Sequence, residues 1–143
     1  MRAAAGMLLA LSACTQPSAR ILPGLLDLPV TPSTQLDPTC SYWSDAEHSM
    51  RHPPEAAACV TAPTTQAEAA AAAYTAAIAQ AGWRAIDDTG NARLYERTIS
   101  PGCKQRVDFR LYAATAPSGD AGDAPKSVFV FAPHPGPVCE ARP

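Results

Sequence analysis

The chain has 143 residues and a net charge of −2, and 47% of its residues are apolar. Ala accounts for 30 residues, whereas Leu, Ile, Val and Phe together number 23, below the usual share of a well-packed domain. This composition excludes a multi-domain enzyme, a polytopic membrane protein, a coiled coil and a strongly basic nucleic-acid binder.

The first fourteen residues have the features of a targeting signal. Arg2 gives a positive start, residues 3–13 are small or apolar, and Cys14 follows them. The apolar run is too short to span a bilayer as a helix, which takes roughly 20 residues. Leu11-Ser12-Ala13-Cys14 resembles the lipobox of bacterial lipoproteins, in which an aliphatic residue and two small residues precede the lipidated Cys.

This resemblance implies cleavage before Cys14 and attachment of two or three acyl chains, such as palmitate, to Cys14. Two or three chains hold a protein stably on a membrane, whereas a single chain holds it only reversibly. Thr15 follows the Cys, and in that family a residue other than Asp at this position implies the outer membrane. The alternative is a conventional secretory signal that is cut nearby and leaves Cys14 as a free thiol.

Four further cysteines predict two disulfides, because an even number in an exported chain is typical of disulfide bonding. Sequence alone allows three pairings. None of the four stands in a C-x-x-C motif or in a His-interleaved zinc spacing, and each bridge is expected to contribute about 2–4 kcal/mol. The four residues are Cys40, Cys59, Cys103 and Cys139.

The composition of residues 14–39 predicts a tether that begins at the lipidated Cys14. Pro is too frequent in this segment for a helix or a central strand. Six aliphatic residues between positions 21 and 30 are unusual for a solvated linker. We expect this aliphatic part to lie across the folded domain or on the lipid surface, and the alternative is a short peptide that docks on a partner.

Residues 40–63 predict a small cysteine-bounded lobe, which is closed at both ends if Cys40 pairs with Cys59. Within it, His48 and His52 stand at positions i and i+4, a spacing that could present both imidazoles to one metal ion. However, Pro53 ends any helix directly after His52. The segment is therefore better interpreted as a solvated polar turn, with a metal site as the alternative.

Residues 64–143 predict the folded domain, which begins with a helix over residues 66–81. The segment is rich in Ala, the best helix former. Thr65 and Glu68 fit a capping box at its start, and Gly82 fits its end. Its apolar stripe consists mostly of methyl groups, which allows close packing on a sheet.

The hydrophobic period then changes from 3.6 to 2 and predicts strands at residues 83–87, 92–98, 103–113 and 127–132. The last of these is continuously apolar, as expected of a strand at the centre of a sheet. We therefore predict an α+β fold. One Ala-rich helix would pack on a small antiparallel sheet of about four strands, stapled by disulfides and carried on a Pro-rich N-terminal tether.

The polar face of the third predicted strand is the candidate binding surface. Residues 84–112 contain six basic and four acidic residues, and Arg106, Arg110 and Tyr112 lie on this face. Such a surface could hold an anionic partner such as peptidoglycan, lipid headgroups or an acidic protein. The alternative is an ordinary solvated sheet face with cross-strand ion pairs.

The sequence contains no nucleophile elbow, phosphate loop or dinucleotide fingerprint, and it suggests no cofactor. We therefore expect a non-enzymatic lipoprotein, anchored through Cys14 on the periplasmic face of the outer membrane. It would bind an envelope protein or peptidoglycan, or contribute to envelope structure. The alternative is a small metal- or ligand-binding carrier that uses His48 and His52.

Overall fold

The computed structural model describes residues 19–40, 56–114 and 126–140. The elements in these residues are β1 (Arg20–Ile21), β2 (Leu28–Pro29), β3 (Gln35–Asp37), β4 (Ala58–Pro63), the 3-10 helix η2 (Thr64–Gln66), α1 (Ala67–Gln80), β5 (Arg84–Asp88), β6 (Ala92–Ser100), β7 (Cys103–Ala114), β8 (Lys126–Pro133) and β9 (Val138–Cys139).

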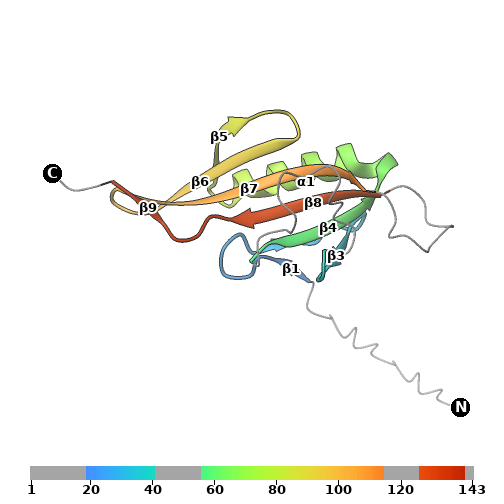
Figure 1. The fold of residues 1–143 in the computed structure, drawn as a ribbon, viewed down its shortest axis with the longest axis horizontal. Helices are drawn as coiled ribbons and strands as arrows, with labels where there is room; N and C mark the ends of the chain where they lie inside the picture. The colour runs from blue at the N-terminus through green and yellow to red at the C-terminus, as the bar shows by residue number, and fades with distance from the viewer. Residues whose placement is uncertain (1–18, 41–55, 115–125, 141–143) are drawn as a thin grey trace, which may run out of the picture.

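Seven of these strands form one antiparallel sheet in the order β3-β4-β8-β7-β6-β5, with β9 paired to the start of β7. The strands from β5 to β8 are a meander, and β8 then pairs with β4, which precedes the helix in the chain. α1 connects β4 to the opposite edge of the sheet and runs along one face of it (Figure 1). β1 and β2 form a separate two-stranded hairpin.

The predicted α+β fold with about four strands is wrong, because the structure is mainly β. The predicted helix and four strands are present, but β3, β4 and β9 extend the sheet. β3 and β9 have only three and two residues, too few to give a readable alternation of apolar and polar positions. β4 becomes a strand because it lies between β3 and β8, and such pairing decides strand formation more than local propensity does.

Backbone hydrogen bonds hold both ends of α1. No side-chain cap bonds to its start, so the predicted capping box of Thr65 and Glu68 does not form, and η2 leads into the helix instead. At the other end Gly82 has a φ of 83°. Its N–H donates to the carbonyl of Ala79 over 3.0 Å, and the N–H of Trp83 donates to the carbonyl of Ile78 over 3.2 Å. These two bonds form a Schellman motif, which confirms that the helix ends before Gly82.

The core lies between α1 and the sheet. The buried stripe of the helix consists of Ala67, Ala70, Tyr74 and Ile78. The ring of Tyr74 lies 5.7 Å from that of Phe129 and 5.3 Å from that of Phe131, centroid to centroid. Three of the four residues in the stripe, Ala67, Ala70 and Ile78, carry no aromatic ring, so the helix can approach the sheet closely.

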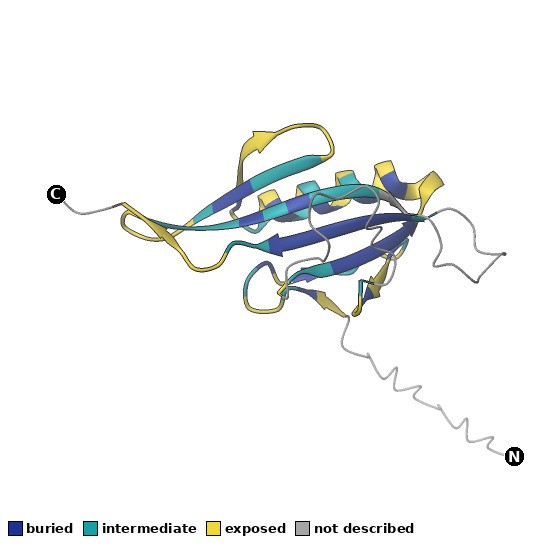
Figure 2. Ribbon diagram, in the orientation of Figure 1, coloured by how far each residue is buried: buried dark blue, intermediate teal, exposed yellow. Residues whose placement is uncertain are grey.

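β8 is the central strand, as its apolar run predicts. Every residue from Ser127 to Ala132 is buried, and Figure 2 shows the strand as an almost continuous dark band. Phe129 and Phe131 face the helix, whereas Val128 and Val130 pack on the opposite face with Cys59. Both faces of this strand are therefore covered.

The aliphatic segment expected across the domain contributes to the same core. Ile21, Leu26 and Leu28 are buried in it. The hydroxyl of Tyr74 lies 2.6 Å from Oγ1 of Thr34, which fixes the segment after β2 against the helix. Residues 20–39 thus belong to the folded structure and do not form a free tether.

Two disulfides are present, as predicted. Cys40 pairs with Cys59 in β4, and Cys103 in β7 pairs with Cys139 in β9. The first bond joins the segment after β3 to β4, and the second joins β9 to the start of β7.

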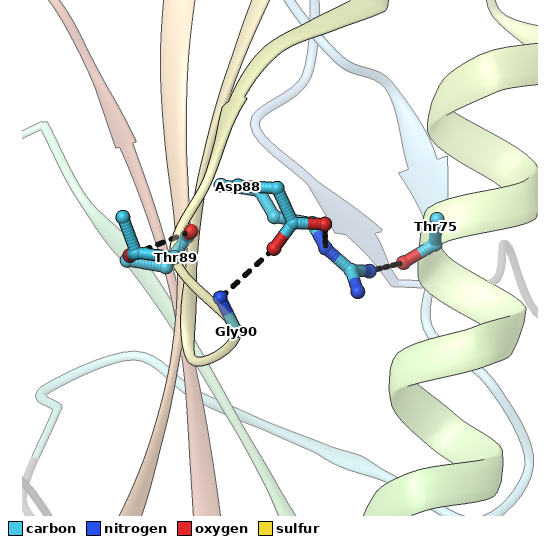
Figure 3. Close-up of polar contacts among 6 residues, drawn as sticks. Thr75, Asp88, Thr89 and Gly90 are labelled. Carbon is cyan, nitrogen blue, oxygen red and sulfur yellow. Dashed lines mark hydrogen bonds and ion pairs between the residues drawn. The ribbon is translucent and has the colours of Figure 1, made fainter.

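The hairpin of β5 and β6 is fastened to the helix through Arg93. Its Nε donates to Oδ2 of Asp88 over 2.9 Å, and its Nη1 donates to Oγ1 of Thr75 over 2.8 Å. Figure 3 shows Asp88 and Thr75, the two partners that this guanidinium joins, and the N–H of Gly90, which donates to the other Asp88 oxygen. The Gly90 N–H, together with Arg93, holds the pKa of Asp88 below its ordinary value despite partial desolvation.

Candidate functional site: a basic surface on β5, β6 and β7

The strand register places four charged side chains together on the sheet. Glu96 in β6 pairs with Arg84 in β5 on one side and with Arg106 in β7 on the other. Lys104 stands two residues before Arg106 and therefore points to the same face. Because the adjacent Tyr95 and Val107 point into the helix-side core, this face is the one opposite α1. We name these residues, Arg84, Glu96, Lys104 and Arg106, the Glu96 cluster.

Three cations surround one carboxylate in the Glu96 cluster. Nη2 of Arg84 donates to Oε1 of Glu96, Nζ of Lys104 lies 3.4 Å from the same oxygen, and Nη2 of Arg106 lies 3.7 Å from Oε2. The Glu96 side chain is only 7% exposed. The cluster therefore has two positive charges in excess of its one negative charge.

Glu96 stays ionised at neutral pH. Burial by itself would raise the pKa of its carboxyl group, but Lys104 and Arg84 beside it outweigh burial and lower the pKa below its ordinary value. The carboxylate consequently holds its cations in place while only one of their charges is neutralised.

A polar hollow of about 410 Å³ adjoins the cluster. It is lined by Gly82, Arg84, Glu96, Arg97, Thr98 and Lys104. Arg84 is 72% exposed and Lys104 36% exposed, so both can give charge-assisted hydrogen bonds to a bound anion. The sequence singled out neither Arg84 nor Lys104 as a binding residue, although Lys104 lies on the predicted polar face of the third strand.

The three predicted binding residues do not form one site. Arg106 belongs to the Glu96 cluster, whereas Nη2 of Arg110 lies 3.7 Å from Oδ2 of Asp108. The same Asp108 oxygen lies 3.1 Å from Nε2 of His134. Tyr112 packs beside the buried valines of β8, and a hydrogen bond with its hydroxyl raises the pKa of Arg110 above its ordinary value. Cross-strand ion pairs are thus present, but around Glu96 they leave positive charge uncompensated.

The proposed lipidation and metal residues, Cys14, His48 and His52, lie outside the residues that the structure describes. Among residues 19–40, 56–114 and 126–140, no group of three His, Cys, Asp or Glu side chains could hold a metal ion. Within the same ranges, neither α1 nor any other helix has the length and apolar content needed to cross a membrane.

Glu96 is a residue of the candidate site that sequence reasoning did not single out. Counting outward from the turn at Pro101 and Gly102 would set Glu96 opposite Val107, but a bulge between Thr98 and Ser100 shifts the register by one residue and brings Glu96 opposite Arg106. Arg84 could not be placed by counting either, since a bulge also interrupts the pairing of β5 with β6.

Comparison of the chain with protein-family models, with curated proteins and with solved structures found no match.

Proposed function

We propose that this chain is a lipoprotein anchored through Cys14 on the periplasmic face of the outer membrane. The support is the lipobox-like Leu11-Ser12-Ala13-Cys14 at the end of a short apolar run. The two disulfides support an oxidising compartment such as the periplasm, because thiols are kept reduced in the cytosol.

We further propose that the folded domain binds an anionic component of the envelope through the Glu96 cluster. The observation that carries this proposal is the convergence of three cations on one buried carboxylate. Its rigid setting favours binding, since the strands that carry the cluster are paired on both sides of Glu96 and β7 is tied to β9 by a disulfide. The donors are therefore held ready before a ligand arrives.

The anchor is tested by labelling cells with palmitate. The wild-type chain should incorporate the label and fractionate with outer membranes. Cys14→Ser should lose the label, and replacing residues 1–14 by a conventional cleavable signal should release the chain into the periplasm. Label retained by Cys14→Ser would contradict lipidation at this residue.

Anion binding is tested with the released chain and two purified envelope fractions, membranes and peptidoglycan. Sedimentation with at least one fraction is expected, and it should weaken with rising salt because the contact is electrostatic. Lys104→Gln should weaken it, whereas Lys126→Gln removes the same charge at the start of β8, away from the cluster, and should have little effect. Equal binding by both variants would contradict a role of the Glu96 cluster.

A further inference from the structure

We propose that the hollow beside the Glu96 cluster binds the phosphate groups of anionic phospholipids in the same membrane that holds Cys14. This inference rests on the proposed function and names the partner. It follows from where the folded structure starts, from what lines the hollow and from the charge of the cluster.

The chain between the anchor and the fold is short. Only residues 15–19 separate Cys14 from Arg20, the first residue of β1, and the N–H of Val30 already donates to the carbonyl of Ala19 over 3.1 Å. Even a fully extended connection of this length reaches only about 20 Å. A tether that continued to residue 39 would have let the domain move far into the periplasm, whereas this one holds it beside the lipid headgroups.

One residue that lines the hollow also contacts the first hairpin of the fold. Arg97 lines the hollow, and its Nη2 donates to the carbonyl of Leu25 over 3.3 Å. Leu25 is in the turn that joins β1 to β2. The same guanidinium stacks over the ring of Trp83, 4.6 Å from its centroid, which fixes its position. The hairpin thus reaches Arg97 on the α1 face, whereas Glu96 and Lys104 line the hollow from the opposite face.

A phosphodiester in the adjacent membrane fits the hollow better than a carboxylate-bearing polymer that lies farther from the domain. Arg84 and Lys104 present guanidinium and ammonium donors at its rim, and ionised Glu96 holds these two cations near each other against their mutual repulsion. A phosphate in the membrane plane is within reach of the anchored domain at all times. Anchoring therefore raises the effective concentration of the headgroups, so that even a weak contact becomes occupied.

The experiment uses the unlipidated chain of residues 15–143, exported so that both disulfides form; it contains every residue that the structure describes. The probes are vesicles of phosphatidylcholine alone and of phosphatidylcholine with phosphatidylglycerol. The chain should sediment with the second and not with the first. Lys104→Gln should weaken binding about fivefold, and Arg84→Gln/Lys104→Gln further, as expected for loss of one and two basic residues at an anionic surface.

Two controls keep the result interpretable. Lys126→Gln should bind the mixed vesicles as the wild type does, and Lys104→Arg, which keeps the charge, should retain binding. Thermal unfolding of each variant identifies any loss of vesicle binding that comes from misfolding. If Lys104→Gln is misfolded, the binding of Lys104→Arg and Lys126→Gln decides whether the charge at position 104 is needed.

Three results would overturn the inference: equal sedimentation with both kinds of vesicle, equal weakening by Lys104→Gln and Lys126→Gln, or binding to peptidoglycan alone. The last would leave the proposed basic binding surface intact and assign it another anionic partner. Because palmitate labelling of the full chain does not depend on vesicle binding, failure of the anchor and failure of this inference are separately visible.

Discussion

At the level of single residues, Glu96 organises the charged face of the sheet. It is nearly buried, yet its register neighbours are cations, and the cations outweigh the effect of burial on its pKa. A neutral side chain at this position would leave Arg84, Lys104 and Arg106 to repel one another. Glu96 therefore both stabilises the sheet and sets the spacing of the basic groups.

Stability should depend on the ionisation of Glu96. Its pKa in the folded chain is below the ordinary value of 4.5, so the carboxylate contributes stability above that value. The contribution is lost as the pH falls through the lower, folded-state pKa. Urea unfolding of the wild type at a series of pH values should show the loss. Glu96→Gln should have a lower free energy of unfolding than the wild type near neutral pH, and the difference between the two proteins should shrink at acid pH.

Asp88 supplies a necessary comparison, because its pKa is also lowered in the fold, chiefly by the N–H of Gly90. Asp88→Asn should therefore remove a separate part of the acid dependence. If Glu96→Gln had the same acid profile as the wild type, the ion pairs around Glu96 would make no contribution to folding.

Among the elements, α1 and the segment after β2 depend on each other through one buried hydrogen bond. The Tyr74 hydroxyl and Oγ1 of Thr34 lie 2.6 Å apart, and the hydroxyl also accepts the N–H of Thr31 over 3.3 Å. Tyr74 is fully buried and Thr34 nearly so. Removing either partner leaves the other with a buried polar group that lacks this bond.

A double-mutant cycle measures this contact. Tyr74→Phe and Thr34→Val should each lower the free energy of unfolding by about 1–2 kcal/mol. The double variant should lose less than the two together, with a coupling energy of about 1 kcal/mol. Additive losses would show that the Pro-rich segment and the helix are held together by apolar packing alone.

Periodicity located α1 and the four strands of the meander because each has a long run of one period. It could not locate β1, β2, β3 or β9, which have two or three residues each. Periodicity gave no reason to bury residues 20–39, where Pro is frequent, and only the six aliphatic residues between positions 21 and 30 indicated that this segment could lie across the domain. Their burial depends on a tertiary partner, the free flank of α1, where Ile21 and Leu28 complete a core that Ala side chains alone leave thin.

The candidate site was predictable only in part, for the same reason. Alternation along β7 placed Arg106 and Arg110 on the outer face, which the structure shares. Grouping them required cross-strand neighbours, and these assign Arg106 to Glu96 and Arg110 to Asp108. Single-strand patterns specify a face, whereas register specifies which charges meet.

For the molecule as a whole, the two disulfides have different roles. Cys59 is fully buried in β4 beside the valines of β8, whereas Cys139 is exposed in β9, a two-residue strand at one end of the sheet. The Cys40–Cys59 bond is therefore part of the packed interior, and the Cys103–Cys139 bond closes a peripheral ribbon.

This difference predicts stepwise reduction. Attack by a thiolate requires access to a sulfur atom, so Cys103–Cys139 should be reduced first under native conditions. Cys40–Cys59 should persist until the sheet opens, and urea should remove the difference between the two. Alkylation at intervals of dithiothreitol treatment, followed by peptide mass mapping, gives the order. Reduction of Cys103–Cys139 frees only β9, so near-ultraviolet circular dichroism should change little at that stage. Earlier or simultaneous reduction of Cys40–Cys59 would place that bond outside the stable interior.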